Sequence, residues 1–441
     1  MKRFISVAIA ALLLLPLVFV FSSCENEGGG VTTLYVYNWG EYISDGSDDS
    51  LDSNAAFEEW YYEEYGEHVK VNYSTFSSNE DLYAKISSGT VSYDVIVPSD
   101  YMIERMINED MLVPLNYENI PNVENLSEDF FREDAPFRYY DPENKYSVPY
   151  FYGVVGVIYN TEMVDEDCEN IGSWNLMWDE DYKGDILQFN NSRDAFGTAM
   201  YKLGLDVNSD NEDDWRAALE ELKNQKNILQ GYVMDEIYNK MENGSAAIAT
   251  YYAGDYFTMY EENEALDFFY PEEGTNLYID AMCIPKGCQN QLIAERYIDF
   301  MLSREPAVAN AEYTYYASPN KLVYEDEEYR DYMEEDFYII YPQVELLGED
   351  EDETASEDIE EEVEEGEEGE EEEDVIVVKV APYKNLSPEK LALVNNLWEE
   401  LKSDMEISVG IYVICIIIVV TLAGLGIFFG VRNFLRKKKY S

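Results

Sequence analysis

Histidine and paired cysteines are almost absent from this chain of 441 residues. His68 is the only histidine, and none of the five cysteines belongs to a C-x-x-C pair. A zinc site needs closely spaced Cys or His ligands, and a Ser-His catalytic site needs a histidine, so the chain has almost no residues from which either site could form. The chain also lacks a G-x-x-x-x-G-K-[ST] loop, so it is not itself a P-loop ATPase.

Positive charge is scarce as well. The 29 Lys and Arg residues face 92 Asp and Glu residues, which gives a formal net charge of -63. A nucleic-acid backbone would be repelled by such a chain, so nucleic-acid binding is excluded. The charge suits a cationic ligand, although acidic tails that serve solubility produce the same balance. Aromatic residues make up 15%, with 39 Tyr among them, and aromatic faces with carboxylates are the groups that bind ammonium ions.

The N-terminus has the layout of an export signal. A charged start, Met1–Arg3, precedes the apolar run Phe4–Phe21, and the letters FSSC and ENEGGG follow. A cysteine after small residues predicts lipoprotein processing, with Cys24 as the acylated first residue of the mature chain. We therefore predict a lipoprotein signal over residues 1–24 and a linker over 25–32. An uncleaved membrane anchor is the alternative.

The C-terminus predicts a second attachment to the same membrane. Residues 407–431 carry no charge and are long enough to span a bilayer as a transmembrane helix. Residues 432–441 contain five basic residues, which is typical of the cytoplasmic side. We therefore expect a cytoplasmic tail and an extracytoplasmic body on the periplasmic or extracellular face of the cell membrane.

The other cysteines give little guidance. Cys415 lies in the predicted membrane span, and Cys168, Cys283 and Cys288 remain. A Cys283–Cys288 bridge and reduced thiols are both compatible with this odd number.

Between the two predicted anchors, strand-like and helix-like segments alternate. Residues 34–39 and 68–76 have strand patterns, whereas 54–66 and 79–89 have helix patterns that end at glycine. This alternation favours parallel α/β sheets with ligands at the carboxyl ends of the strands. The β-rich run 146–160 suits a chain that crosses between two lobes. We expect lobe 1 to contain residues 33–147 and 279–324, and lobe 2 to contain residues 148–278 and 325–403.

An acidic block interrupts the end of the second lobe. Residues 349–374 contain 19 acidic residues among 26 and no basic residue, so they cannot bury a core and should be disordered. A solvating surface insertion is the simpler interpretation, and weak collection of cations is the alternative.

Several short motifs, taken in order, resemble one protein family. They are YVYNWGEYI, NEDLYAKISSG, YDVIVPSDY, YSVPYFYGVVGVIYN, SWNLMWDEDYKGDI, NNSRDAF, YPEEGTNLYIDAMCIP and YASPN. From about Thr33 to Lys402 the chain resembles the spermidine/putrescine-binding proteins of bacterial ABC importers, within the extracellular solute-binding protein family. The resemblance implies a two-lobed periplasmic-binding-protein-like α/β fold of type II, with a hinge that closes on ligand. It also implies no catalysis and no cofactor.

A polyamine requires carboxylates at its ammonium groups and aromatic faces along its methylenes. The resemblance assigns such roles to residues of this chain. Aromatic walls are implied for Trp39, Tyr42, Tyr101, Tyr252, Tyr278 and Tyr316, and polar or acidic contacts for Glu41, Ser99, Asn191, Asp194 and Asp280.

Some positions depart from the family pattern. Gly40 replaces a small hydroxylic residue, and Asn191 stands where spermidine binders carry an Asp. Tyr252 and Tyr278 stand where the family tends to use Trp. One carboxylate fewer favours putrescine over a triamine, yet Glu41, Asp194 and Asp280 could still serve three amines, so the polyamine stays open.

We therefore predict a membrane-tethered receptor that captures a polyamine and delivers it to an ABC permease with a separate ATPase subunit. One alternative is a receptor of the same fold for another organic cation or small solute. A bare metal ion fits poorly, because an ion that carboxylates chelate prefers a shell made only of oxygen ligands, without aromatic walls. Another alternative is a cell-surface hydrolase with paired carboxylates.

Overall fold

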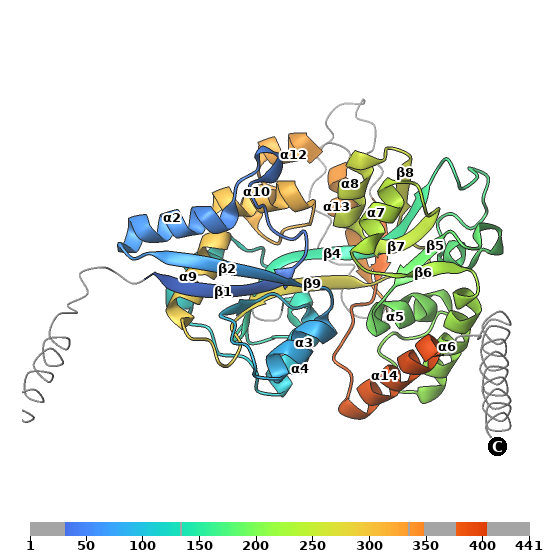
Figure 1. Ribbon diagram of the computed structural model, residues 1–441, viewed down its shortest axis with the longest axis horizontal. Helices are drawn as coiled ribbons and strands as arrows, with labels where there is room; N and C mark the ends of the chain where they lie inside the picture. The colour runs from blue at the N-terminus through green and yellow to red at the C-terminus, as the bar shows by residue number, and fades with distance from the viewer. Residues whose placement is uncertain (1–30, 133–134, 334–335, 348–375, 404–441) are drawn as a thin grey trace, which may run out of the picture.

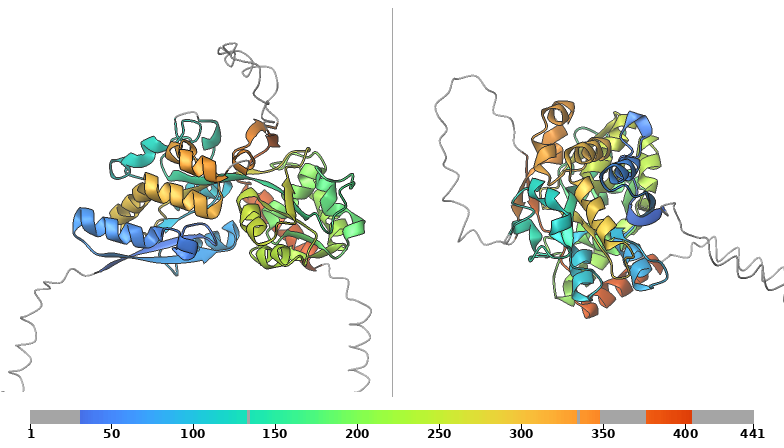
Figure 2. Two further views of the ribbon diagram at one scale, coloured as in Figure 1. Left: turned by 90° about the horizontal axis from the view of Figure 1, so that it is seen from above. Right: turned by 90° about the vertical axis from the view of Figure 1, so that its left-hand side faces the viewer.

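The computed structural model describes residues 31–132, 135–333, 336–347 and 376–403. The predicted signal with Cys24, the acidic block 349–374, the predicted membrane span 407–431 and the basic tail 432–441 lie outside these residues, as does most of the predicted linker. Within the described ranges, no helix combines the length and apolar character needed to cross a membrane. The described residues form two lobes that lie side by side (Figures 1 and 2).

A single β-sheet path runs through both lobes. Its strand order is β2-β1-β3-β9-β4-β7-β5-β6, and β8 also pairs with β4. The strands are β1 (Thr32–Trp39), β2 (Val69–Phe76), β3 (Val95–Ile96), β4 (Ser147–Asn160), β5 (Ile186–Phe189), β6 (Leu229–Val233), β7 (Ile248–Tyr252), β8 (Leu266–Phe269) and β9 (Leu277–Cys283).

The expectation of parallel sheets holds only within each lobe. Strand β1 is parallel to β2 and β3, and β5 is parallel to β6 and β7. The two strands that connect the lobes, β4 and β9, pair antiparallel to each other and to their other neighbours. Because the chain leaves the first lobe along β4 and returns along β9, these strands run in opposite directions, and the sheet is mixed.

The first lobe covers its sheet with helices whose ends follow local sequence signals. Asp52 caps α2 by accepting from the Ala55 amide at 2.9 Å, and Gly66 ends the helix with φ 69°. Such a left-handed position suits glycine because a side chain would be strained there. The helices here are α2 (Ser53–Tyr65), α3 (Asn79–Ser87), α4 (Asp100–Asn108), α9 (Gln291–Met301) and α10 (Arg304–Thr314). The predicted strands 34–39 and 68–76 and helices 54–66 and 79–89 are confirmed within one or two residues at each end.

The second lobe repeats this organisation. Its helices are α5 (Ser192–Lys202), α6 (Glu212–Lys226), α7 (Glu236–Glu242), α8 (Ala253–Glu262) and the C-terminal α14 (Pro388–Ser403), which packs against α6 (Figure 1). Three short helices follow α10: α11 (Lys321–Tyr324), α12 (Glu327–Met333) and α13 (Phe337–Ile340). Buried Trp174 and Trp215 lie in the core of this lobe.

Two parallel strands precede the last crossing of the chain. Strand β10 (Gln343–Leu346) pairs with β11 (Val377–Val380), and the Thr275 amide donates to the Lys379 carbonyl at 3.0 Å. The chain then runs over residues 381–387 to α14. The exact residue ranges predicted for the two lobes remain a prediction.

Cys168, Cys283 and Cys288 are free thiols. The Cys288 thiol donates to Asp94 Oδ1 at 3.2 Å, whereas Cys283 is fully buried. Of the two possibilities that the sequence leaves open, the structure has reduced thiols.

Candidate ligand-binding site

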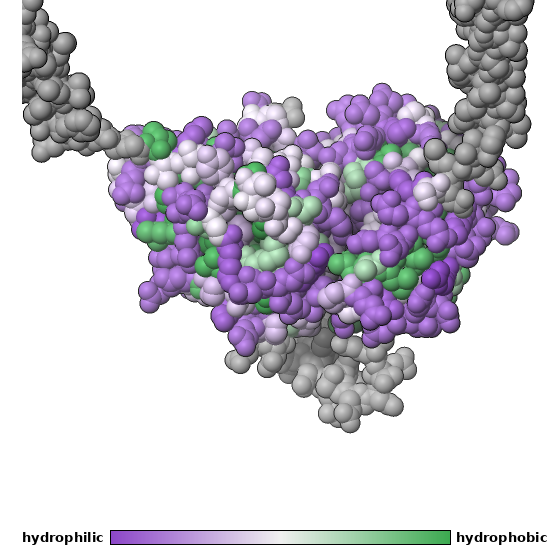
Figure 3. Space-filling view, turned by 60° about the horizontal axis from the view of Figure 1, so that its bottom comes forward, coloured by the Kyte–Doolittle hydropathy of each residue, from purple (hydrophilic) through white to green (hydrophobic). Residues whose placement is uncertain are grey.

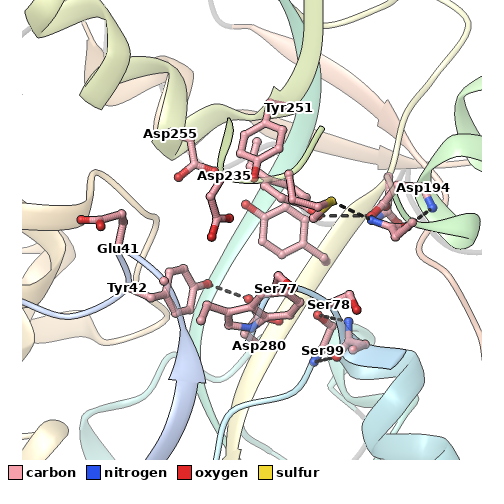
Figure 4. Close-up of a pocket in the computed structure, with 18 of the residues that line it drawn as sticks. Glu41, Tyr42, Ser77, Ser78, Ser99, Asp194, Asp235, Tyr251, Asp255 and Asp280 are labelled. Atoms are coloured by element: carbon pink, nitrogen blue, oxygen red, sulfur yellow. Dashed lines mark hydrogen bonds between the residues drawn. The ribbon is translucent and has the colours of Figure 1, made fainter. Parts of the chain in front are cut away.

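A cavity that is partly open to solvent lies between the lobes. All eleven residues to which the sequence assigns ligand contacts line it: Trp39, Glu41, Tyr42, Ser99, Tyr101, Asn191, Asp194, Tyr252, Tyr278, Asp280 and Tyr316. Figure 4 shows several of them converging on one space from both lobes.

The ends of parallel strands bring most of these residues together. Trp39 is the last residue of β1, Ser99 follows β3, Asn191 follows β5 and Tyr252 is the last residue of β7. Carboxyl ends of parallel strands meet at one edge of a sheet, where helices begin and ligands commonly bind. Tyr278 and Asp280 come instead from the crossing strand β9.

Asp280 is a nearly buried carboxylate with a free acceptor. Its side chain is 4% exposed, and Oδ2 accepts a hydrogen bond from the Tyr42 hydroxyl at 2.7 Å. Oδ1 is buried and accepts no hydrogen bond from the described part of the chain. Burial raises the pKa of Asp280 to about 7, and the neighbouring hydroxyls of Ser99 and Tyr42 offset only part of this rise. A cationic ligand group would satisfy both the free oxygen and the charge.

Asp194 is held by two neighbours on the opposite wall. Asn191 caps α5, accepting from the Asp194 amide at 2.8 Å and donating its own amide to Asp194 Oδ2 at 2.7 Å. The Tyr252 hydroxyl donates to the same oxygen at 3.2 Å. Burial raises the pKa of Asp194, while hydrogen bonds from Asn191 and Tyr252 lower it in part. Asn191 therefore orients Asp194 and adds no charge.

Arg193 does not form an ion pair with Asp194. Its guanidinium donates to the Val207 carbonyl at 2.8 Å and to Asn208 Oδ1 at 2.7 Å. It also lies 4.4 Å from the ring centre of Tyr383. Arg193 therefore holds the segments behind the cavity.

Asp255 is a site residue that the sequence reasoning missed. It is 6% exposed and accepts from the Tyr316 hydroxyl at 2.7 Å and from the Tyr238 hydroxyl. Burial raises its pKa to about 7, and the nearby carboxylates of Asp235 and Glu41 add to the rise. The signal that could have found Asp255 is its position three residues after Tyr252, in the first turn of the helix that follows β7.

Glu41 and Asp235 are exposed carboxylates that also line the cavity. A Cβ added to Gly40 would lie 3.5 Å from Asp235 Oδ2, so the turn after β1 approaches α7 closely there. Partial desolvation raises the pKa of Glu41 although its side chain is exposed, and the carboxylates of Asp45 and Asp235 add to the rise. In Figure 4, Glu41 and Asp194 lie on opposite sides of the group, which gives the cavity carboxylates at both ends.

Two carboxyls, the buried Asp100 and the half-buried Glu80, support the wall from the first lobe. Asp100 accepts from the Tyr139 hydroxyl, and burial raises its pKa to about 8. Glu80 accepts from the Tyr101 hydroxyl at 3.2 Å, and burial raises its pKa as well.

Glycines make room for two of the aromatic walls. The ring of Tyr278 crosses Gly153 on β4, where a Cβ would lie 2.3 Å from the Tyr278 hydroxyl oxygen. The ring of Tyr316 crosses Gly254 on α8, where a Cβ would lie 2.6 Å from Tyr316 Cδ2. Neither ring could take this position over a larger residue, so each glycine sets the place of one wall.

The cavity is negative and aromatic. Among the described residues that line it, seven are acidic, nine are aromatic and none is basic. Several carboxyl pKa values are raised, chiefly because burial disfavours the charged form. The buried Trp39 Nε1 also donates no hydrogen bond within the described residues. No group of three or more His, Cys, Asp or Glu side chains suited to a metal ion occurs in those residues. The arrangement suits an apolar chain with more than one ammonium group.

Comparison with known proteins agrees with this geometry. A family model described as bacterial extracellular solute-binding protein matches residues 55–334. The chain belongs to this family. It is 32% identical over 289 residues to the spermidine/putrescine-binding periplasmic protein of Escherichia coli, an alignment that covers 65% of this chain and 78% of that protein.

Solved structures in the same family share the fold. A spermidine/putrescine ABC transporter substrate-binding protein of Streptococcus pneumoniae aligns with a TM-score of 0.60 and 31% identity, covering 84% of this chain and 98% of that one. A lipoprotein of Treponema pallidum aligns with a TM-score of 0.56 and 26% identity, covering 66% and 88%. The predicted two-lobed periplasmic-binding-protein-like fold is confirmed.

Membership of this family also bears on the alternatives. The family and its named relatives bind solutes for ABC transporters and are not enzymes, so a hydrolase is not supported. The relatives named periplasmic support an extracytoplasmic location for this solute-binding protein. Its surface, on the face shown in Figure 3, is mostly hydrophilic over both lobes.

Proposed function

We propose that this solute-binding protein captures a polyamine between its lobes and delivers it to the permease of an ABC importer. The observation that carries the proposal is the buried Asp280: Tyr42 donates to one of its oxygens, and the described ranges supply neither a donor to the other oxygen nor a basic residue that lines the cavity. A buried ion without a partner is costly, so an ammonium group at this position would be strongly favoured.

The proposed binding mode uses two carboxylates from facing walls of the cavity. Asp280 binds one ammonium group, and Asp194 binds another on the wall opposite. Trp39, Tyr278 and Tyr316 lie along the methylene chain, where cation–π contacts contribute about 0.5–2 kcal/mol each. Because Asn191 is neutral, the Asp194 end offers one carboxylate, which favours putrescine, while Glu41 and Asp255 could serve a third amine.

Calorimetry tests this function directly. The full chain is titrated with putrescine, cadaverine, spermidine and spermine, and we expect saturable binding of at least one of them. Absence of binding to all four, beside binding of another organic cation such as a quaternary amine, would move the assignment to the alternative receptor.

We further propose that the receptor is tethered by a lipid on Cys24 and by a transmembrane helix over residues 407–431. The sequence patterns at both ends support this tether. Mass spectrometry of the N-terminal peptide should find a lipid-modified Cys24. An unmodified cysteine, or protease access to the basic tail in intact cells, would contradict the tether.

A further inference from the structure

The last crossing between the lobes, residues 381–387, borders the ligand cavity. It lies beyond the residues that the family model matches and follows the acidic block in the sequence. Hydrogen bonds fasten it to both lobes. The Tyr201 hydroxyl donates to the Ala381 carbonyl at 2.6 Å, and the Asn385 amide donates to Glu104 Oε2 at 2.8 Å. Residues 381–387 are therefore an ordered part of the wall.

Tyr383 is the residue of this crossing that reaches the cavity. It is 3% exposed, and its amide donates to Asn276 Oδ1 at 3.3 Å. Its ring extends over α5, where a Cβ on Gly197 would lie 1.9 Å from the Tyr383 hydroxyl oxygen. The Arg193 guanidinium lies 4.4 Å from the ring centre. Glycine at position 197 and the cation above the ring together fix one place for this side chain.

A second cavity, partly open to solvent, borders the same crossing and is lined by Ala381, Pro382 and Lys384. Asp206 and Glu273 line it too, whereas Tyr383 lines only the ligand cavity. The crossing thus borders both cavities, and the Tyr383 ring lines the ligand cavity.

We propose that Tyr383 is the stop that sets the length of the bound polyamine at the Asp194 end of the cavity. The Tyr383 and Tyr101 rings lie at 6.3 Å between centres and close this end beside Asp194. Lys384 is the one basic residue among the described residues that line the second cavity. Asp206 and Glu273 outnumber Lys384, so the residues that line the second cavity keep a net negative charge.

Loss of the ring would join the two spaces. A longer polyamine could then extend past position 383 and place an ammonium group near Asp206 or Glu273. Short diamines gain nothing from the added space and lose the contact with the ring. This inference rests on the proposed polyamine binding, but it concerns ligand length and not the presence of a site.

The test compares Tyr383→Ala with Tyr383→Phe in the full-length chain. Calorimetry measures Kd for putrescine, spermidine and spermine, and thermal denaturation checks folding. We expect the ratio of Kd for spermine to Kd for putrescine to fall about tenfold or more in Tyr383→Ala, since pocket contacts of this size change discrimination on that scale. Tyr383→Phe keeps the ring and should keep the parental ratio.

A second variant secures the result if the alanine variant does not fold. Tyr383→Leu keeps a buried apolar side chain but shortens it, and it should shift the ratio in the same direction. The proposal that Tyr383 sets ligand length would be overturned if a folded Tyr383→Ala or Tyr383→Leu chain kept the parental ratio of Kd values. An equal loss of affinity for all three amines would overturn it as well. If the parent chain binds no polyamine at all, the proposed function fails instead, and the two failures are distinct.

Discussion

Replacing Asp280 by asparagine should separate ligand binding from folding. Asparagine has the same shape, and its Oδ1 can still accept the hydrogen bond that Tyr42 gives at 2.7 Å. The change removes only the negative charge from a side chain that is 4% exposed. We expect Asp280→Asn to fold, to lose polyamine affinity and to become more stable without ligand.

The magnitudes follow from burial. Removing one partner of a desolvated charge pair costs about 2–5 kcal/mol of binding free energy, which raises Kd roughly 30-fold or more. In the ligand-free protein, the rise of the Asp280 pKa from 3.8 to about 7 corresponds to roughly 4 kcal/mol against the ionised form. Because the folded state holds this proton more tightly than the unfolded state, the stability of the parent falls as pH rises from 4 to 7. Asp280→Asn removes that penalty.

Calorimetry gives the affinity, and thermal denaturation at pH 8 gives the stability. Glu264→Gln, an exposed acid outside the cavity, is the matched control and should change neither quantity. Parental affinity in a folded Asp280→Asn chain would refute the role of this carboxylate. A fall in ligand-free stability would refute the view that Asp280 is strained without ligand.

The remaining predictions concern pH, packing and the acidic block. Polyamine affinity should fall from pH 8 to pH 6, because an ammonium group must lower the pKa values of Asp280 and Asp255, which lie near 7 without ligand. Binding near pH 7 should therefore release protons. A flat pH profile of affinity would contradict this. Gly254→Ala should weaken binding by about 1–3 kcal/mol in calorimetry, because Tyr316 must leave its place; parental affinity would contradict it. Deletion of residues 349–374 should slow ligand association at low salt and preserve equilibrium affinity at high salt. The reason is that salt screens the attraction between the acidic block and a cationic ligand over about 8 Å at physiological ionic strength. An affinity loss that persists in high salt would contradict this.

The sequence by itself determined the order of the elements and much of the cavity. The glycine that ends α2 and the serine and aspartate caps are local signals, so strands and helices of the first lobe could be predicted from patterns of a few residues. The motif order placed all eleven expected residues in one cavity, because most of them follow a strand end or lie on β9; Tyr316, which follows α10, is the exception. The composition also predicted a negative, aromatic lining, since 92 Asp and Glu residues face 29 Lys and Arg residues and aromatic residues make up 15% of the chain.

Only the tertiary structure decided the partners and the charge states. Tyr42 and Asp280 are 238 positions apart, and no local pattern shows that one donates to the other. Burial raises the pKa of Asp255, and burial depends on how α8 packs against the first lobe. The antiparallel pairing of β4 and β9 follows from the path of the chain between the lobes. Tyr383 contacts Gly197 although the acidic block lies between them in the sequence. Packing sets such contacts between distant segments, and neighbouring residues do not.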